Sequence, residues 1–316
     1  MNARHHLAAA VLLGAAALAP LAGSPVRAAD TTTVRVGATG NDAAAEVYYA
    51  DELGLFKKRG LEVQISQQRN GAASAAAVAG GALDIGEQNV VSMTNAHSRG
   101  LPFVYIAPAA QYTEKASSTN LLVAKNSPIK SAKDLDGKTV GVNALNDLTQ
   151  IAAEAWIDKN GGQSSSVHFI EMTAAEIPPA IARGTIQAGV VPEPALSMSE
   201  GETRVLGKQY SAIAPEFMIN GWFATSDWVK KNPAAAKKFA DAIVEAAAWA
   251  NAHHAESAKI LEKHSKIEPA VIERMTRATY ATKFDPKTMQ EVVDTAVRYK
   301  AVKSGFAASE MYAANL

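Results

Sequence analysis

The chain has 316 residues, of which 48% are hydrophobic and 20% charged, with 31 basic and 31 acidic side chains and no cysteine. This is ordinary globular composition, and the length suits two compact units better than one. The balanced charge provides no basic field for a phosphate backbone, so nucleic acid is not an expected partner. The lack of cysteine excludes disulfides, thiolate metal sites and cysteine nucleophiles.

Residues 1–28 have the pattern of an export signal. A short polar start with Arg4 precedes an uncharged apolar run from Leu7 to Ala22, and Val26-Arg27-Ala28 ends the segment. The run has 16 residues. At about 1.5 Å per residue it falls short of a hydrocarbon core about 30 Å thick, which disfavours an uncleaved anchor. We predict a cleavable signal peptide over 1–28 and a periplasmic protein without a lipid anchor.

Strands and helices alternate through the first part of the remaining chain. The predicted strands are 33–38, 61–66, 83–86 and 103–107, and the predicted helices are 43–53, 71–79 and 90–98. Gly54 stands where a helix C′ glycine belongs. Alternation at this spacing predicts βαβ units and a mostly parallel sheet.

A second series of the same kind begins near Asn120. Its predicted strands are 121–124, 139–142, 167–171 and 187–191, and its predicted helices are 131–135, 148–160 and 174–183. Val34-Arg35-Val36 opens the first series and Val140-Gly141-Val142 opens the second, 106 residues later. The repeat predicts two similar α/β lobes, although coincidence among common α/β patterns is the alternative.

The last hundred residues are mostly helical in pattern. A strand is predicted over 217–225, and Asn232-Pro233 and Asp285-Pro286 each combine an N-cap residue with proline at the first helical position. Apolar stripes follow at helical spacing. They comprise Phe239, Ile243 and Ala250 in one helix and Met289, Val292, Val293 and Ala296 in the other. We expect this block to pack on the first lobe, so that the chain crosses to the second lobe and returns.

Three segments resemble a known family. Residues 50–63 (ADELGLFKKRGLEV) are similar to the first helix and second strand of the sulfonate, taurine and nitrate binding proteins, a group that includes the NMT1-like pyrimidine-precursor binders. Residues 126–142 (NSPIKSAKDLDGKTVGV) resemble the start of the second lobe in type II periplasmic binding proteins. Residues 226–233 fit the return to the first lobe.

The resemblance implies an α/β fold with two lobes, each a mostly parallel sheet flanked by helices, joined by two crossover strands. The expected boundaries are 29–116 and 217–316 for the first lobe and 117–216 for the second. The resemblance also implies a substrate-binding protein of an ABC transporter, which binds a small molecule between the lobes and delivers it to a permease and ATPase complex. We expect a monomer.

Ligands of open α/β sheets bind beyond the carboxyl ends of the strands. The candidate ligand-binding residues therefore follow predicted strands or lie near the crossovers. They are Thr39, Asn41, Asp42, Arg69, Asn70, Gly71, Glu87, Asn89, Tyr112, Asn143, Asn146, Asp147, Glu193, Asn220 and Trp222.

These residues leave the ligand's charge open. Helix starts after Asn70 and Asp147, together with Arg69, favour a small organic anion such as a sulfonate or carboxylate. Carboxylates in the same loops, Glu193 foremost, suit a pyrimidine or an amine instead. Tyr112 and Trp222 could stack on a ring or simply pack at the hinge. A solvated Arg69 and plain helix capping by Asn146 and Asp147 are the structural alternatives.

We predict no catalytic residue, metal or cofactor. His253, His254, Glu256 and His264 are spaced loosely like metal ligands, but a solvated helix face is expected. No G-x-S-x-G motif or glycine-rich phosphate loop occurs. Among enzymes with this fold, the pyrimidine synthase of thiamine biosynthesis has a cysteine-rich motif that is absent here, and the menaquinone-pathway enzymes are cytoplasmic. A periplasmic partner that presents ligand to a sensor fits the same sequence.

Overall fold

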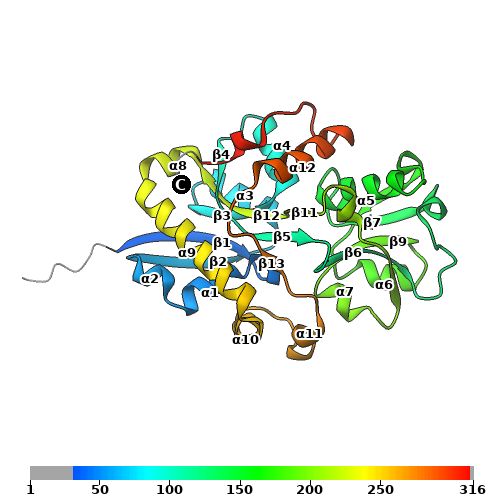
Figure 1. The fold of residues 1–316 in the computed structure, drawn as a ribbon, viewed down its shortest axis with the longest axis horizontal. Coiled ribbons are helices and arrows are strands. Elements are labelled where there is room, and N and C mark those ends of the chain that lie inside the picture. The colour runs from blue at the N-terminus through cyan, green and yellow to red at the C-terminus, as the bar shows by residue number, and fades with distance from the viewer. Residues whose placement is uncertain (1–30, 314–316) are drawn as a thin grey trace, which may run out of the picture. The chain divides into compact units, whose positions relative to one another are not determined.

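A computed structural model describes residues 31–313, so the predicted signal peptide lies outside the described residues. Two five-stranded sheets and one three-stranded sheet make up the described strands (Figure 1). Within residues 31–313, no helix is both long and apolar enough to cross a membrane.

The first sheet has the strand order β2-β1-β3-β12-β4. Its strands are β1 (Thr32–Thr39), β2 (Leu61–Gln68), β3 (Ile85–Asn89), β4 (Phe103–Pro108) and β12 (Asn220–Thr225). β1 pairs in parallel with β2 and β3, whereas β12 pairs antiparallel with β3 and β4. Val34 and Val36 of β1 are fully buried because this sheet is covered by helices on both faces.

The second sheet has the strand order β10-β6-β9-β7-β8. Its strands are β6 (Thr119–Ala124), β7 (Thr139–Val142), β8 (His168–Glu171), β9 (Ala188–Pro192) and β10 (Thr203–Gly207). β7 is parallel to β8 and β9, and β6 is antiparallel to β9 and β10. The two-lobed α/β fold is thus confirmed, with sheets that mix parallel and antiparallel pairs. The antiparallel pairs arise at β6 and β12, which follow the two crossovers.

A three-stranded antiparallel sheet links the two larger sheets. It has the order β11-β5-β13 and consists of β5 (Ala110–Thr113), β11 (Glu216–Met218) and β13 (Thr279–Tyr280). β5 lies in the chain between β4 and β6, and β11 directly precedes β12, so both connections pass side by side (Figure 1). The strand predicted over 217–225 is therefore two strands divided at Ile219, because the chain changes sheets there.

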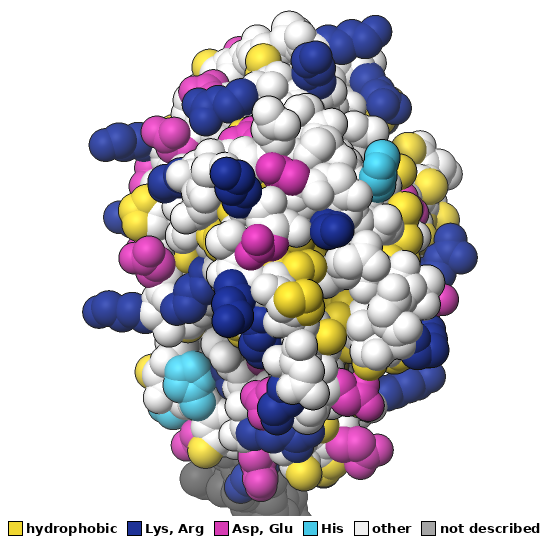
Figure 2. Space-filling model, turned by 90° about the vertical axis from the view of Figure 1, so that its right-hand side faces the viewer, with side chains coloured by type: hydrophobic (Ala, Val, Ile, Leu, Met, Phe, Trp, Pro, Cys, Tyr) yellow, Lys and Arg dark blue, Asp and Glu magenta, His cyan; other side chains and the backbone are white. Residues whose placement is uncertain are grey.

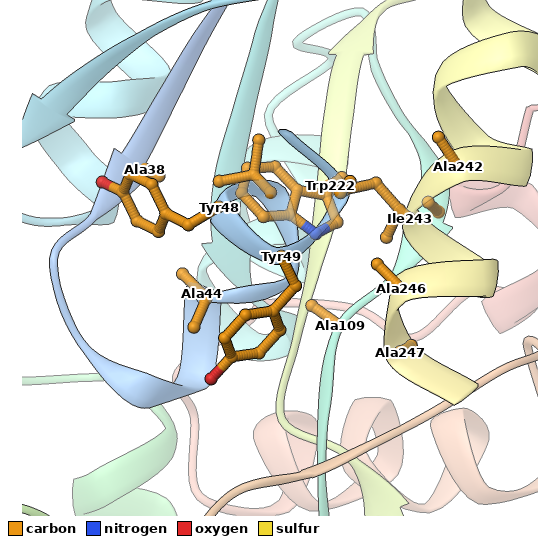
Figure 3. Close-up of a cluster of buried hydrophobic side chains, with 14 of the residues drawn as sticks. Ala38, Ala44, Tyr48, Tyr49, Ala109, Trp222, Ala242, Ile243, Ala246 and Ala247 are labelled. Atoms are coloured by element: carbon orange, nitrogen blue, oxygen red, sulfur yellow. The ribbon is translucent and has the colours of Figure 1, made fainter. Parts of the chain in front are cut away.

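Helices cover both faces of the first sheet. One face packs against α1 (Glu46–Glu52), α2 (Leu55–Lys58), α8 (Ser226–Lys231), α9 (Pro233–Ala252), α10 (His254–His264) and α11 (Pro269–Arg274). The other face packs against α3 (Gly71–Ala79), α4 (Val90–Ser98) and α12 (Pro286–Arg298), with the short η5 (Ala308–Met311). Figure 3 shows the Trp222 ring of β12 among Tyr49 of α1 and Ile243 of α9. The apolar stripes predicted for α9 and α12 are buried, with α9 in contact with β4 and α12 in contact with α4 and β11.

The second sheet packs against shorter helices. These are α5 (Leu148–Lys159), α6 (Ile177–Ala182) and α7 (Ala195–Met198), with the 3-10 turns η2 (Ala132–Leu135), η3 (Ser164–Ser166) and η4 (Gln209–Ala212). One apolar cluster continues between the sheets, because Leu148 and Ile151 of α5 join Met289 and Val293 of α12. Figure 2 views the end that carries β7, β9 and α6, and there Lys and Arg side chains alternate with Asp and Glu.

Three predicted helix boundaries can be compared with the observed capping. Gly54 follows α1 with φ +66°, and the Asp285 side chain accepts a hydrogen bond from the Lys287 backbone N–H at the start of α12, so both predictions are confirmed. Asn232 was predicted to cap α9, but its side chain makes no capping hydrogen bond there. Its amide instead donates to the Trp228 carbonyl, which also accepts from the Asn232 backbone N–H where α8 ends.

Candidate ligand site

The carboxyl ends of β1 and β3 lie together at one edge of the first sheet. Thr39 ends β1 and Asn89 ends β3, and Asn89 pairs with Asn220 at the start of the antiparallel β12. The 3-10 turn η1 (Asp42–Ala44) and the start of α1 follow directly after β1. Polar residues from three distant segments therefore meet at the edge where ligands of such sheets bind.

Glu87 holds this edge together from inside. Its carboxylate accepts from the Thr39 hydroxyl at 3.1 Å and from the Asn220 amide, which also donates to the Ala43 carbonyl at 3.1 Å. Burial raises the pKa of Glu87, while the bonds from Asn220 and Thr39 partly offset that rise. Both of its oxygens have donors within the protein, so Glu87 positions the loop over residues 39–43.

Asp42 is bonded by groups from the C-terminal part of the chain. Its carboxylate accepts from Arg277 Nε at 2.9 Å and Nη2 at 3.0 Å, from the Ala278 backbone N–H at 2.6 Å and from the Tyr280 hydroxyl at 3.0 Å. The Asp42 and Arg277 side chains are only 7% and 11% exposed. This set of donors occupies the carboxylate, so Asp42 fixes the end of β1 to the segment before β13.

Glu46, at the first position of α1, lies buried beside these groups without a partner. Both of its carboxyl oxygens, Oδ1 of Asn41 and Oδ1 of Asn220 have no donor from another residue among residues 31–313, and the Glu46 backbone N–H lies close enough to its own carboxyl group to lower the pKa in part. Burial raises the pKa of Glu46 well above its usual value, and the nearby carboxylates of Glu87 and Asp42 raise it further. All four of these unpaired atoms are oxygens, which accept hydrogen bonds from a donor when the carboxyl group is ionised.

Asp147 connects the second lobe to this edge. Its Oδ1 accepts from the Leu148 backbone N–H at 2.7 Å, which caps α5, and its Oδ2 accepts from Asn89 Nδ2 at 2.9 Å and Ser92 Oγ at 3.0 Å. Burial raises the pKa of Asp147 against the effect of those three bonds. Asn146 beside it has φ 55°, a left-handed conformation that asparagine tolerates. The Asp147 side chain therefore both caps α5 and bonds the second lobe to the first.

Glu193 forms a second bridge between the lobes. It follows β9, accepts from the Ser197 backbone N–H at 3.0 Å and hydroxyl at 2.9 Å, and accepts from the Thr276 backbone N–H at 3.0 Å. Burial raises its pKa. A cavity of ≈ 230 Å³ lies beside it, with Arg204 and Arg274 among its lining residues.

The remaining predicted residues fall outside this arrangement or at its margin. Tyr112 and Trp222 are 1% and 0% exposed in apolar clusters, so neither ring face is free for stacking. Arg69 is exposed, and no bond to it occurs within the described chain. Asn70 caps α3 by accepting from the Ala73 N–H at 2.9 Å, directly before Gly71. Asn143 is partly exposed after β7, where its backbone N–H donates to Thr149 Oγ1 at 3.3 Å.

Sequence reasoning missed Glu46, Arg277 and Thr276. Glu46 stands in the apolar run AAAEVYYA, so a lone acid among core residues was an available indication. Arg277 lies 235 residues from its partner Asp42, and nothing local marks the pairing. No group of three or more His, Asp or Glu that could hold a metal occurs in the described part of the chain. His264 instead bonds Glu52 at 2.7 Å.

Two mixed sheets joined by paired connecting strands, with polar loops at the facing edges, define a two-lobed binding-protein fold. A family profile described as NMT1/THI5 like matches residues 41–257, and the chain belongs to that family. A protein of Brucella abortus (strain 2308), whose name calls it a binding protein and gives no ligand, is 27% identical over 265 residues, covering 78% of this chain and 76% of its own.

Solved structures share the fold at low sequence identity. The aliphatic sulphonate binding protein SsuA of Escherichia coli is 19% identical with a TM-score of 0.74, over 89% of this chain and 97% of its own. The nitrate-binding protein NrtA of Synechocystis PCC 6803 is 15% identical with a TM-score of 0.74, over 89% and 85%. The desulfurization enzyme DSZB is 13% identical with a TM-score of 0.66, over 90% and 97%. The fold therefore serves both binding proteins and an enzyme.

Proposed function

We propose that this chain is the solute-binding component of an ABC importer, which captures one small molecule between its lobes and delivers it to the permease and ATPase complex. The observation that carries the proposal is the polar edge built from β1, β3 and β12, which bonds to the second lobe through Asp147. Membership of the NMT1/THI5-like family and the fold shared with SsuA support it.

The proposal includes the cellular setting. Residues 1–28 are a cleavable export signal, and the mature monomer acts in the periplasm without a lipid. Its first lobe comprises residues 29–116 and 217–316, and its second lobe comprises 117–216. The membership of the two large sheets supports this division, because β6 to β10 belong to one sheet and β1 to β4 with β12 to the other.

Ligand capture couples to movement of the lobes about β5 and β11. A ligand shifts such an equilibrium only when it binds the closed form more tightly than the open form. The bonds from Asn89 and Ser92 to Asp147, and from Thr276 to Glu193, join the lobes close to the proposed ligand position. We infer that these bonds stabilise the closed form relative to the open form.

The candidate ligands differ in charge, and the observed side chains favour one kind over the other. An organic anion, the expectation from Arg69 and the helix starts, would need donors, yet Arg69 is exposed and Arg277 is bonded to Asp42. The unpaired oxygens of Glu46, Asn41 and Asn220 favour the alternative, a ligand that carries N–H donors. We propose a binding role and not an enzymatic one, because the polar side chains at this edge are bonded to one another or buried and none is placed as a nucleophile or general base.

A ligand screen by thermal shift tests the proposal. Sulfonates, aromatic carboxylates, nitrate, pyrimidines and small amines would be added to the mature protein purified without co-purified solute. A ligand at 100 times its Kd stabilises the native state by about 2.7 kcal/mol. We expect one class to raise the melting temperature and to be transported when the chain is reconstituted with its permease and ATPase. No response from any class, or turnover of the bound compound, would contradict the proposal.

A further inference from the structure

Four buried oxygen atoms lie unpaired around the start of α1. They are both carboxyl oxygens of Glu46, Oδ1 of Asn41 and Oδ1 of Asn220, and Glu46 and Asn220 are 0% and 3% exposed. The Asn220 amide orientation is fixed, because its Nδ2 donates to Glu87 and to the Ala43 carbonyl. A buried polar atom left unpaired costs about 1–3 kcal/mol. A molecule that donates hydrogen bonds to all four atoms would recover that cost.

The surrounding charges select the sign of such a molecule. Carboxyl groups of Asp42 and Glu87 face Glu46 from η1 and β3, and the hydroxyls of Tyr49 and Tyr280 lie close to the same group. The cation at this position, Arg277, is already bonded to Asp42 by two nitrogens. An added anion would therefore meet the carboxyl groups of Asp42, Glu46 and Glu87 at close range.

The unpaired atoms lie next to the surface at this edge of the first sheet. Thr39, Gly40, Asn41 and Ala43 are partly exposed, although Oδ1 of Asn41 is buried. Glu46 is the second residue after η1, so the loop that covers it is the loop that faces solvent. A small group that reaches the carboxyl group must therefore enter through this loop, between Thr39 and Ala43.

We propose that this edge binds a small cationic head group with several N–H donors, a guanidinium or a primary ammonium, through Glu46, Asn41 and Asn220. This inference rests on the proposed function, because it names the solute class that the binding protein takes. An N–H-rich cation supplies charge-assisted hydrogen bonds to a carboxylate, and a guanidinium supplies two in parallel. A quaternary ammonium has the charge but no N–H donor and does not meet the requirement.

Binding of a cation at Glu46 is also expected to release a proton. Burial raises the pKa of Glu46, whereas a bound cation favours the carboxylate, so binding of a cation shifts the Glu46 equilibrium towards loss of its proton. The proton of Glu46 then passes to solvent as the N–H···O bonds form. The released proton is measurable, because the calorimetric heat of binding then depends on the ionisation enthalpy of the buffer.

Titration calorimetry with methylguanidinium tests the inference, with tetramethylammonium and methanesulfonate as matched probes. We expect methylguanidinium to bind with proton release and the other two to bind at least tenfold more weakly. Glu46→Gln should weaken methylguanidinium binding at least tenfold and abolish proton release. Glu154→Gln is the control, because Glu154 is another carboxyl with a buried unpaired oxygen, on α5, and should bind as the wild type does.

Two results would overturn the inference. In the first, methanesulfonate or a neutral ligand from the screen binds, and Glu46→Gln leaves its affinity unchanged. This result would refute the cationic ligand while leaving the binding-protein function intact. Failure of every probe and every screened class would refute both. Should Glu46→Gln fail to fold, Asn41→Ala provides the second variant, since Asn41 is partly exposed. It should weaken methylguanidinium binding several-fold, and unchanged affinity would count against the site.

Discussion

Replacement of Asp42 by alanine tests how the C-terminal segment is attached to the ligand edge. The change removes the acceptor for two nitrogens of Arg277, the Ala278 N–H and the Tyr280 hydroxyl. The Arg277 side chain is 11% exposed, so its charge would remain buried without a counter-ion. Loss of one partner from a buried ion pair costs about 3–5 kcal/mol. We expect Asp42→Ala to lower the free energy of unfolding by that amount.

Urea denaturation followed by circular dichroism measures the loss. Asp241→Ala is the matched control, because Asp241 pairs with Lys237 on the exposed face of α9 at 3.0 Å. Such an exposed helix pair contributes about 0.3–0.5 kcal/mol. The double variant Asp42→Ala with Arg277→Met should recover part of the loss, because it removes the unpaired charge. A cost for Asp42→Ala no greater than that of Asp241→Ala would refute the structural role assigned to this pair.

Three further predictions concern other parts of the structure. Burial raises the pKa of Glu46, so above its usual value of 4.5 the native chain keeps a proton that the unfolded chain loses, and stability falls as pH rises. Glu46→Gln should therefore raise the melting temperature more at pH 8 than at pH 5, and a difference independent of pH would contradict this. Asp147→Ala leaves Asn89 and Ser92 unpaired at a cost of about 1–3 kcal/mol and should reduce hydrogen-exchange protection at the start of α5, with unchanged protection as the contrary result. Gly86→Ala places a methyl group against Ser74 and within 2.9 Å of the Phe223 ring, so its free energy of unfolding in urea should fall by about 1–3 kcal/mol. Gly201→Ala has open space around the added methyl group and should change that free energy by no more than about 0.5 kcal/mol. Equal effects of the two substitutions would refute the packing argument.

Local pattern was sufficient to predict most elements. The helices over 71–79 and 90–98 and the strand over 139–142 have the predicted bounds, because apolar periodicity, flanking glycine and polar caps agree there. Residues expected to follow strands lie at one edge of the first sheet, because the carboxyl edge is fixed by topology, although Glu87 and Asn89 lie within β3 and not after a strand over 83–86. Thr39, Asn41, Glu87, Asn89 and Asn220 accordingly lie together.

Features that depend on distant pairing were not predictable in this way. The antiparallel placement of β12 depends on a return from the second sheet, and the division at Ile219 follows from it. Trp222 was placed near the ligand because it follows the crossover, but strand alternation turns its ring into the core beside Phe239. The fully buried Glu46 has the local sequence of a first-turn helix residue, and only the packing of β3 and β12 around it encloses the carboxyl group.

A crystal structure of the mature protein with the tightest ligand from the screen would show directly whether the solute binds between the lobes. We predict one molecule there, bonded both to Asn41 or Glu46 at the first sheet and to residues 143–147 or Glu193 at the second. A ligand bound to the outer surface of one lobe, with the edge at Glu46 still unpaired, would contradict it.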